Sequence, residues 1–473
     1  MENAAVRKKK AVGLDLTNSP IFKTLLVFSI PIILANLIQQ LYSMVDLIVI
    51  GQYVGSTGTV GVSTGGEIAD LITPVAMGFA TAGQIYIAQL AGAKDDSHIK
   101  STVNTLITFM MIVSIALMAA AIIFCKPILM MLHCPAEAFK QAQDYMIITA
   151  IGFPFIFGYN AVCGILRGMG ESKRPLLFIS IAAVINIFGD IWLVAAFHLE
   201  AAGTAIATSA SQAGSFIAAL IFLYKHRDRF DFSMKLTNMK MNPQELGILV
   251  KLGIPQVIRS TLVRFSLLWI NSNINVYGLE VSAVNSIGNK IQKFFDVFYS
   301  GVDTASAAMI GQNLGAKKKE RASKTTWATF AMTMSSGAVI ALLCLLFPKQ
   351  IFTLFTTDAQ VQTMGMLYMR LLVIHIFASC FVGTFQAMVT GCGFVSLGFA
   401  IGILDGVVCK VGLSLIFVNL MKMGYVGYFL GIDCSRILPG ILCFWYFMSG
   451  KWKTRKLLTE QKHAKQIEQA EAD

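Results

Sequence analysis

Two aspartates of this sequence stand inside long apolar runs, where an acidic side chain is costly. Asp190 lies in "NIFGDIWLV", within residues 176–197, and Asp46 lies in "SMVDLIVIG". An ionised carboxylate in apolar surroundings is unstable unless it is paired, and neither acid has a Lys or Arg near its depth in its own run. The sequence therefore predicts two carboxyl groups that bind a proton or a cation.

The composition places most of the chain in lipid. Hydrophobic residues make up 55% of the sequence, charged residues make up 14%, and the mean hydropathy is +0.66, well above that of soluble domains. Runs long enough to cross a hydrocarbon core of about 30 Å as helices recur along the chain. Twelve are predicted as spans, at residues 22–50, 60–90, 102–125, 139–165, 175–197, 200–224, 246–277, 281–312, 325–347, 362–391, 394–420 and 424–448. The expected fold is an all-α polytopic membrane protein.

The net charge of +12 follows the loops and argues against nucleic-acid binding. Basic residues gather in alternate loops, at residues 7–10, 94–100, 167–174, 225–240, 317–324 and 451–465, whereas the intervening loops offer few. This is the positive-inside pattern of an even number of spans. We therefore expect a multi-pass protein of the cell membrane with both termini in the cytoplasm.

The sequence also contains an internal repeat. "FSIPIILANLIQQ" and "LGIPQVIRSTLVR" each begin with an Ile-Pro inside a span, and "QLAGAKDD" or "QNLGAKKK" follows about 60 residues later. A third echo is "LRGMG", ending at Gly170, and "VTGCG", ending at Gly393. The pattern predicts two six-helix lobes related by a pseudo-two-fold axis. The predicted divisions are a cytoplasmic N-terminal segment (1–21), an N-lobe (22–224), a basic cytoplasmic linker (225–245), a C-lobe (246–450) and a cytoplasmic tail (451–473).

This topology places four polar side chains at one depth in the N-lobe. Asp46 and Asp190 each lie about eight residues from the outer end of a span, roughly 12 Å at the helical rise. Asn186 lies one turn deeper on the face that carries Asp190, and Thr208 is about eight residues into span six from the outside. Two carboxyl groups so placed are predicted to share a proton or to hold a cation between them.

The order and spacing of these motifs resemble those of the multidrug and toxic compound extrusion (MATE) family. The resemblance rests on the Ile-Pro of span one with an aspartate fifteen positions on, "GAK" after span two, "LRGMGESKRP" after span four and "NxxxD" in span five, and covers about residues 25–450. It implies a twelve-helix, two-lobed antiporter that expels organic, often cationic, compounds in exchange for H+ or Na+. It also implies that the N-lobe holds the cation at Asp46, Asn186, Asp190 and Thr208, and that Pro31 bends span one as protonation changes.

The second lobe departs from the family pattern. Some members carry acidic residues in spans seven and ten, where this chain has Arg259, Arg264, Arg370 and His375, so cation coupling through this lobe is not predicted. Its remaining charges lie on spans eight, eleven and twelve, at Lys290, Lys293, Asp296, Asp303, Asp405, Lys410, Asp433 and Arg436. We interpret them as ion pairs that hold helices together, with a polar wall of the substrate path as the alternative.

Glu67 and Asp70 form a second acidic pair in the N-lobe. They stand three residues apart on span two, and therefore on one helix face. Two interpretations stay open, a possible substrate path that attracts cations and a solvated entrance.

No signature of an enzyme or of a cofactor site stands out in the sequence. The nine cysteines show no CxxC pair, and neither an HExxH motif nor a plausible Ser/His/Asp set is visible. We expect no enzymatic activity, no cofactor, and no metal other than a possible Na+ at the four N-lobe residues. The expected partners are small organic cations or amphipathic drugs and membrane lipids, and the protein is expected to be a monomer.

The predicted function is a cation-coupled antiporter that exports small amphipathic, often cationic, compounds by alternating access. H+ and Na+ both fit the four polar groups, and the sequence does not choose between them. The alternative function is a lipid-linked precursor flippase of the wider superfamily. Such flippases often have fourteen spans and a strongly cationic cavity, whereas twelve spans are predicted here.

Overall fold

The computed structural model describes residues 13–227, 241–458 and 460, and these residues form helices without a strand. The predicted linker, the N-terminal segment and the tail fall partly outside this range, at residues 228–240, 1–12, 459 and 461–473. The first half contains α1 (Ile21–Tyr53), α2 (Gly55–Ala93), α3 (Asp96–Ile123), α4 (Cys125–Met131), α5 (Ala136–Ile151), α6 (Phe153–Gly168), α7 (Lys173–Asp190), a π-helix (Ile191–Ala196) and α8 (Glu200–Lys225).

The second half follows the same order of long helices. It contains α10 (Pro243–Asn275), α11 (Leu279–Gly315), α12 (Lys319–Leu346), α13 (Pro348–Thr353) and α14 (Ala359–Gly391). One span then combines α15 (Val395–Ile403), a π-helix (Leu404–Cys409), α16 (Lys410–Leu415) and a second π-helix (Ile416–Leu420), and the last span combines α17 (Tyr425–Cys434) and α18 (Ile437–Met448). A short 3-10 helix (Lys451–Lys453) comes after it.

The described helices agree with twelve membrane spans. Ten are long and apolar enough to cross a membrane, and α5 and α6, which meet at 43°, make an eleventh if they count as one span. Helix α11 is 37 residues long but carries four charged residues in its middle, so hydropathy alone does not mark it. The prediction of an all-α polytopic membrane protein is therefore confirmed.

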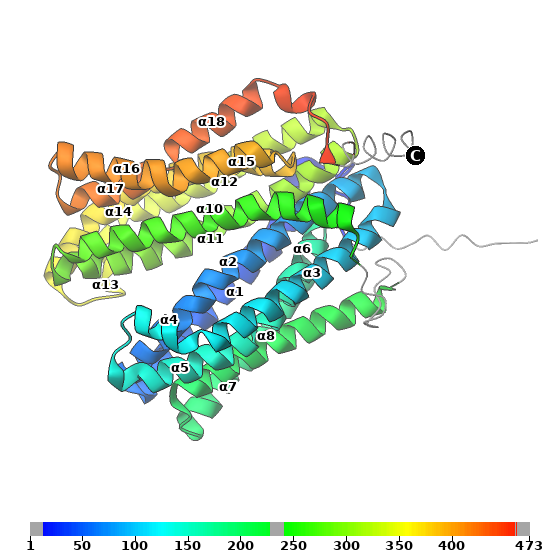
Figure 1. Ribbon diagram of the computed structural model, residues 1–473. Coiled ribbons are helices and arrows are strands. Elements are labelled where there is room, and N and C mark those ends of the chain that lie inside the picture. The colour runs from blue at the N-terminus through cyan, green and yellow to red at the C-terminus, as the bar shows by residue number, and fades with distance from the viewer. Residues whose placement is uncertain (1–12, 228–240, 459, 461–473) are drawn as a thin grey trace, which may run out of the picture.

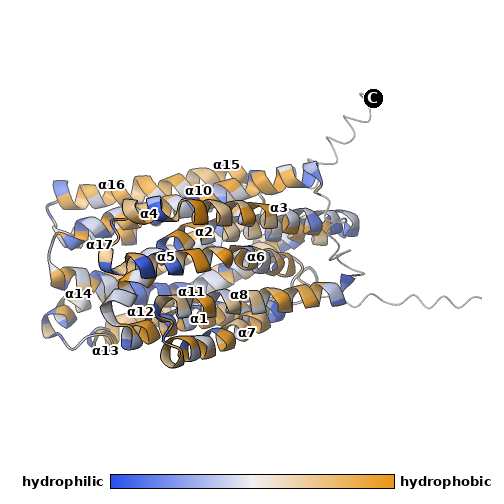
Figure 2. Ribbon diagram, turned by 60° about the horizontal axis from the view of Figure 1, so that its bottom comes forward, coloured by the Kyte–Doolittle hydropathy of each residue, from blue (hydrophilic) through white to orange (hydrophobic). Residues whose placement is uncertain are grey.

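Hydrophobic residues cover most of the helical surface, and hydrophilic residues gather mainly toward the two ends of the bundle (Figure 2). In lipid a backbone must satisfy its own hydrogen bonds, which a helix does within one segment. This explains why long apolar runs form uninterrupted helices, and why irregular backbone is confined to short turns between them.

The two halves form separate helix bundles that meet through α1 and α2 on one side and α10 and α11 on the other (Figure 1). A buried apolar cluster joins them, in which Leu25 and Phe28 of α1 pack with Val302 and Ala305 of α11. The bundles converge at one end and diverge toward the other (Figure 1).

The repeated motifs form matching turns at the end where the bundles converge. Lys94 and Lys317, which end the two GAK motifs, have φ of 59° and 60°, while Gly170 and Gly393 have φ of 81° and 66°. Each pair is 223 residues apart, and the left-handed turn lets the chain reverse immediately after a helix. We call this end of the bundle, marked by those four turns, the basic end. The described part of the N-terminal segment also lies there, since the Leu14 amide donates to the Gly170 carbonyl at 3.0 Å.

Candidate functional site

The four polar residues predicted to bind a cation lie together in the first bundle. The carboxyl group of Asp46 on α1 lies beside Asn186 and Asp190 of α7 and beside Thr208 of α8. The side-chain nitrogen of Asn186 is 3.5 Å from the Thr208 hydroxyl. We call these four residues the acid pair site.

Both acids of the acid pair site lack a basic partner. Asn186 and Asp190 are fully buried, and among the described residues neither carboxylate oxygen of Asp190 has a hydrogen-bond partner. One oxygen of Asp46 and the amide oxygen of Asn186 are likewise buried without a partner in the described part of the chain. Leaving such acceptors unpaired costs about 1–3 kcal/mol each, and more for charged groups. The arrangement therefore favours a bound proton, or a cation coordinated by oxygen atoms.

The local backbone brings these helices close together. Gly189 faces Ala207, where an added Cβ would stand 2.9 Å from the Ala207 side chain, so α7 and α8 can approach closely beside the site. Immediately after Asp190 the helix changes from α to π geometry. Single-turn π segments occur often at functional sites, because they alter the direction of side chains within an otherwise regular helix.

Apolar clusters close the acid pair site on both sides along the membrane normal. On the side away from the basic end, Val49 and Ile50 pack with Val62 and Val194. On the other side, Tyr42 packs with Ile179 and neighbouring alanines. The two carboxyl groups therefore lie in a largely apolar compartment that excludes bulk water.

Two residues that the sequence analysis did not single out complete the surroundings. Tyr42, one turn before Asp46, accepts a hydrogen bond of 3.3 Å from Gln212 of α8, and Tyr145 of α5 lies near both acids. No sequence motif marks either of them. Among the described residues, no group of three or more His, Cys, Asp or Glu side chains could hold a metal ion, so a multidentate transition-metal site does not fit this part of the chain.

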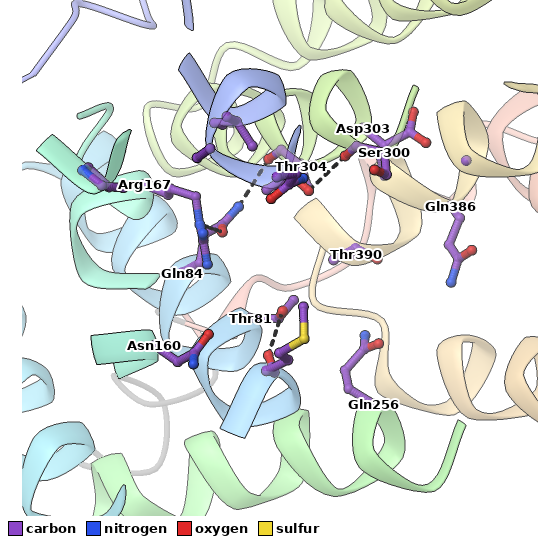
Figure 3. Close-up of a pocket in the computed structure, with 18 of the residues that line it drawn as sticks. Thr81, Gln84, Asn160, Arg167, Gln256, Ser300, Asp303, Thr304, Gln386 and Thr390 are labelled. Atoms are coloured by element: carbon purple, nitrogen blue, oxygen red, sulfur yellow. Dashed lines mark hydrogen bonds between the residues drawn. The ribbon is translucent and has the colours of Figure 1, made fainter. Parts of the chain in front are cut away.

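A cavity of about 310 Å³ lies between the two bundles, nearer the basic end (Figure 3). Fourteen of its twenty-one lining residues are polar, and side-chain amides and hydroxyls outnumber charged groups. Arg167 of α6 donates to Gln84 at 2.9 Å on one side, and Asp303 of α11 lies on the other. The cavity is thus a polar compartment with one acid.

Matching hydrogen bonds between the bundles close the cavity toward the basic end. Gln89 at the end of α2 donates to the Gly391 carbonyl at 2.9 Å, and Gln312 at the end of α11 donates to the Gly168 carbonyl at 2.8 Å. Donors and acceptors are each 223 residues apart, so the two bonds are related by the internal repeat. We call this pair of bonds the glutamine latch.

The helix crossing beneath the glutamine latch depends on two glycines of the GAK motifs. A Cβ atom at Gly92 would overlap the carbonyl oxygen of Gln312, and one at Gly315 would overlap that of Gln89. Only glycine lets the backbones of α2 and α11 approach this closely.

Glu67 and Asp70 have a basic partner in the other bundle. Arg264 of α10 lies 2.5 Å from Asp70 and 3.5 Å from Glu67, and the two acidic side chains are 59% and 38% exposed. This contact links the bundles on the divergent side of the cavity. Because the charges are neutralised in part and exposed to screening, the pair contributes little stability, typically below about 1 kcal/mol.

The charges of the second bundle divide into two sets. Lys290, Lys293 and Arg370 are exposed, whereas Asp405 is buried 3.8 Å from Arg259. The remaining buried acids face His375, Lys410 or Arg436. This agrees with the interpretation of these charges as pairs between helices, except that His375 is also part of the network.

The comparison with known families decides the affiliation. The MatE family model matches residues 31–192 and again residues 255–416, once in each half. The chain belongs to this family. Its members are transporters rather than enzymes, in agreement with the sequence prediction.

Relatives of known or predicted role cover the whole MATE chain. The probable multidrug resistance protein YpnP of Bacillus subtilis is 26% identical over 94% of this chain and 99% of its own length. The multidrug export protein MepA of Staphylococcus haemolyticus is 24% identical over 94% of this chain and 96% of its own. A solved structure, described as the outward-facing conformation of a multidrug resistance MATE family transporter, superimposes with a TM-score of 0.88 at 21% identity, covering 94% of this chain and 99% of that one. This likeness establishes the MATE fold.

Proposed function

We propose that this MATE protein exports small amphipathic, often cationic, compounds in exchange for a cation that binds at the acid pair site. The observation that carries the proposal is the buried, unpartnered pair Asp46 and Asp190 on two helices of one lobe. The names of the relatives support drug-like compounds as cargo. The protein acts in the cell membrane as a monomer.

The proposed orientation places the basic end in the cytoplasm, because Lys and Arg gather at loops on the cytoplasmic side of membrane proteins. The structure then represents a state open toward the outside, with the glutamine latch closed and the lobes apart at the far end (Figure 1). Export requires the opposite state, in which the latch opens to admit substrate from the cytoplasm.

The proposed coupling follows from charge. Without a bound ion the acid pair site carries up to two negative charges in an apolar compartment, and a proton or cation entering from the outside removes this penalty. Ion binding thereby changes the relative stability of the two states, which is the thermodynamic requirement for coupling. We assign H+ as the coupling ion. Na+ could use the same carboxylate, amide and hydroxyl oxygens, which suit a hard cation.

Pro31 is proposed as the hinge of α1. It lies fifteen residues before Asp46, is buried, and removes the hydrogen bond that would run to the Val27 carbonyl. We expect Pro31→Ala to restore that bond and to slow ethidium export about tenfold while changing ethidium affinity less than about threefold. Transport by liposomes and fluorescence binding would be measured on one preparation. Equal losses of affinity and rate would contradict hinge use and indicate a packing role.

Drug efflux by intact cells tests the proposed function. A bacterial strain depleted of its own exporters and expressing this protein should lose preloaded ethidium several times faster than the strain without it, and a protonophore should abolish the difference. Flippase activity is the alternative, and the many neutral amides of the cavity and its twelve spans do not favour it. A strain that retains ethidium but survives depletion of a lipid-precursor flippase would support that alternative instead.

A further inference from the structure

A buried histidine lies between two acids inside the C-lobe. His375 of α14 is 1% exposed, its Nε2 is 3.3 Å from Asp296 of α11, and its Nδ1 is 3.7 Å from Asp433 of α17. The Gln292 side-chain nitrogen is 3.1 Å from the same Nε2, and the Tyr299 hydroxyl donates to Asp296. Because each ring nitrogen faces a carboxylate, the imidazole and the two acids can share a proton.

These groups belong to one larger charge cluster that spans five helical segments. Arg436 interacts with Asp296, Asp303 and Asp405. Lys410 interacts with Asp405 and Asp296, and also with Asp433 and His375. We call the set the C-lobe cluster, and its charged members among the described residues are the acids Asp296, Asp303, Asp405 and Asp433 and the bases Arg259, Lys410 and Arg436, with His375.

The charge balance of the C-lobe cluster requires one more proton. Four carboxylates and three permanent cations leave one net negative charge if His375 is neutral. Net charge inside a membrane protein is costly, so the balanced state is the one with a single additional proton, carried by His375 or by one of the carboxyl groups. Lys290, Lys293 and Arg370 are exposed and do not alter this count.

The C-lobe cluster reaches the cavity through one face of α11. Gln292, Asp296, Tyr299 and Asp303 follow at spacings of four, three and four residues, which aligns them along one side of the helix. Asp303 lines the cavity, and one of its oxygens is buried without a hydrogen-bond partner among the described residues. An added Cβ at Gly383 of α14 would overlap the Asp303 carboxylate, so this acid is held at the cavity wall by the neighbouring helix (Figure 3).

We propose that Asp303 is the binding site for the cationic group of the substrate, and that substrate binding there displaces one proton from the C-lobe cluster. A cation beside Asp303 supplies the positive charge that the proton supplied before, so the cluster stays neutral through the exchange. This site is separate from the acid pair site, and it gives each lobe one exchangeable proton. The inference rests on the proposed export function for its physiological meaning, but the exchange itself is a property of equilibrium binding.

Proton release on ethidium binding tests this exchange. Protein purified in detergent at low buffer concentration is mixed with ethidium, and a pH-indicator dye counts the protons released. Asp303→Asn should weaken ethidium binding about tenfold, the loss expected for one coupled charge contact, and should release no C-lobe proton. Asp433→Asn leaves three acids and three bases, so it should bind ethidium through Asp303 but release one proton fewer than the parent.

Two further variants separate charge balance from a structural role. His375→Gln keeps four acids and three bases, so the extra proton moves to a carboxyl group, and release should persist. Lys293→Gln, an exposed site on α11, should match the parent in both readouts. The parent's affinity for ethidium should rise with pH, because proton and ethidium compete, and this slope should flatten in Asp433→Asn.

The outcomes distinguish this inference from the proposed function. If Asp433→Asn releases as many protons as the parent, or if His375→Gln abolishes release, the charge-balance account is wrong. If the parent releases protons that disappear only in Asp190→Asn, coupling resides in the N-lobe alone, and the C-lobe proposal fails while the proposed function stands.

Discussion

Asp190→Asn is expected to reduce coupled export of ethidium about tenfold or more, since a neutral amide cannot cycle between charged and protonated states. The substitution keeps the size and burial of the side chain, so the protein should remain folded in the membrane at the parent level. Asp46→Asn should act similarly, because the two carboxyl groups lie side by side and a single ion serves both. Initial rates of ethidium efflux from cells, normalised to protein in the membrane, provide the measurement.

The matched control is Glu137→Gln, which neutralises an exposed acid in the first turn of α5 in the same lobe. It should export at the parent rate. Parent-level export by both Asp190→Asn and Asp46→Asn would show that the acid pair site has no part in coupling.

Gly92→Ala and Gly315→Ala are expected to open the basic end. The new methyl group would overlap a backbone carbonyl of the opposite lobe, so α2 and α11 must separate and the glutamine latch must lengthen. Overpacking of this kind costs about 1–3 kcal/mol, which would shift a two-state equilibrium by about 5- to 150-fold toward the separated state. Export should fall because the outward-open state becomes rare.

Distances between spin labels at the exposed residues Lys173 and Lys319, in a background without the partly exposed Cys134 and Cys434, report the change. The distribution should move to longer distances in both glycine variants. Gly398→Ala is the control, since an added Cβ there meets no atom within 4 Å. Unchanged distances in Gly92→Ala and Gly315→Ala would mean that the crossing relaxes without separating the lobes.

Helix number and the acid pair site could be predicted because their signals are local. Apolar run length gives a span directly, and an acid such as Asp190 within such a run needs a specific physical reason. Depth counting from helix ends brought Asp46 and Asp190 to one level, and the structure places them side by side. The GAK motifs were visible as a repeat, but their role at the helix crossing depends on the packing of α2 against α11.

Contacts between distant spans could not be predicted. Arg264 was not recognised as the partner of Glu67 and Asp70, because the three residues lie on helices far apart in sequence. His375 was noted only as a departure from the family pattern, whereas its position between Asp296 and Asp433 depends on the arrangement of three helices. Tyr42 and Tyr145 carry no sequence signal, since aromatic residues are common in membrane helices.

The most direct test of cation coupling at the acid pair site uses purified protein in liposomes with an imposed pH gradient and without sodium. Acid on the face opposite the basic end should drive ethidium toward that face, and Asp190→Asn should transport no faster than protein-free liposomes. A sodium gradient at equal pH identifies the ion if the pH gradient is without effect. Gradient-driven transport of equal rate in the parent and in Asp190→Asn would contradict the account.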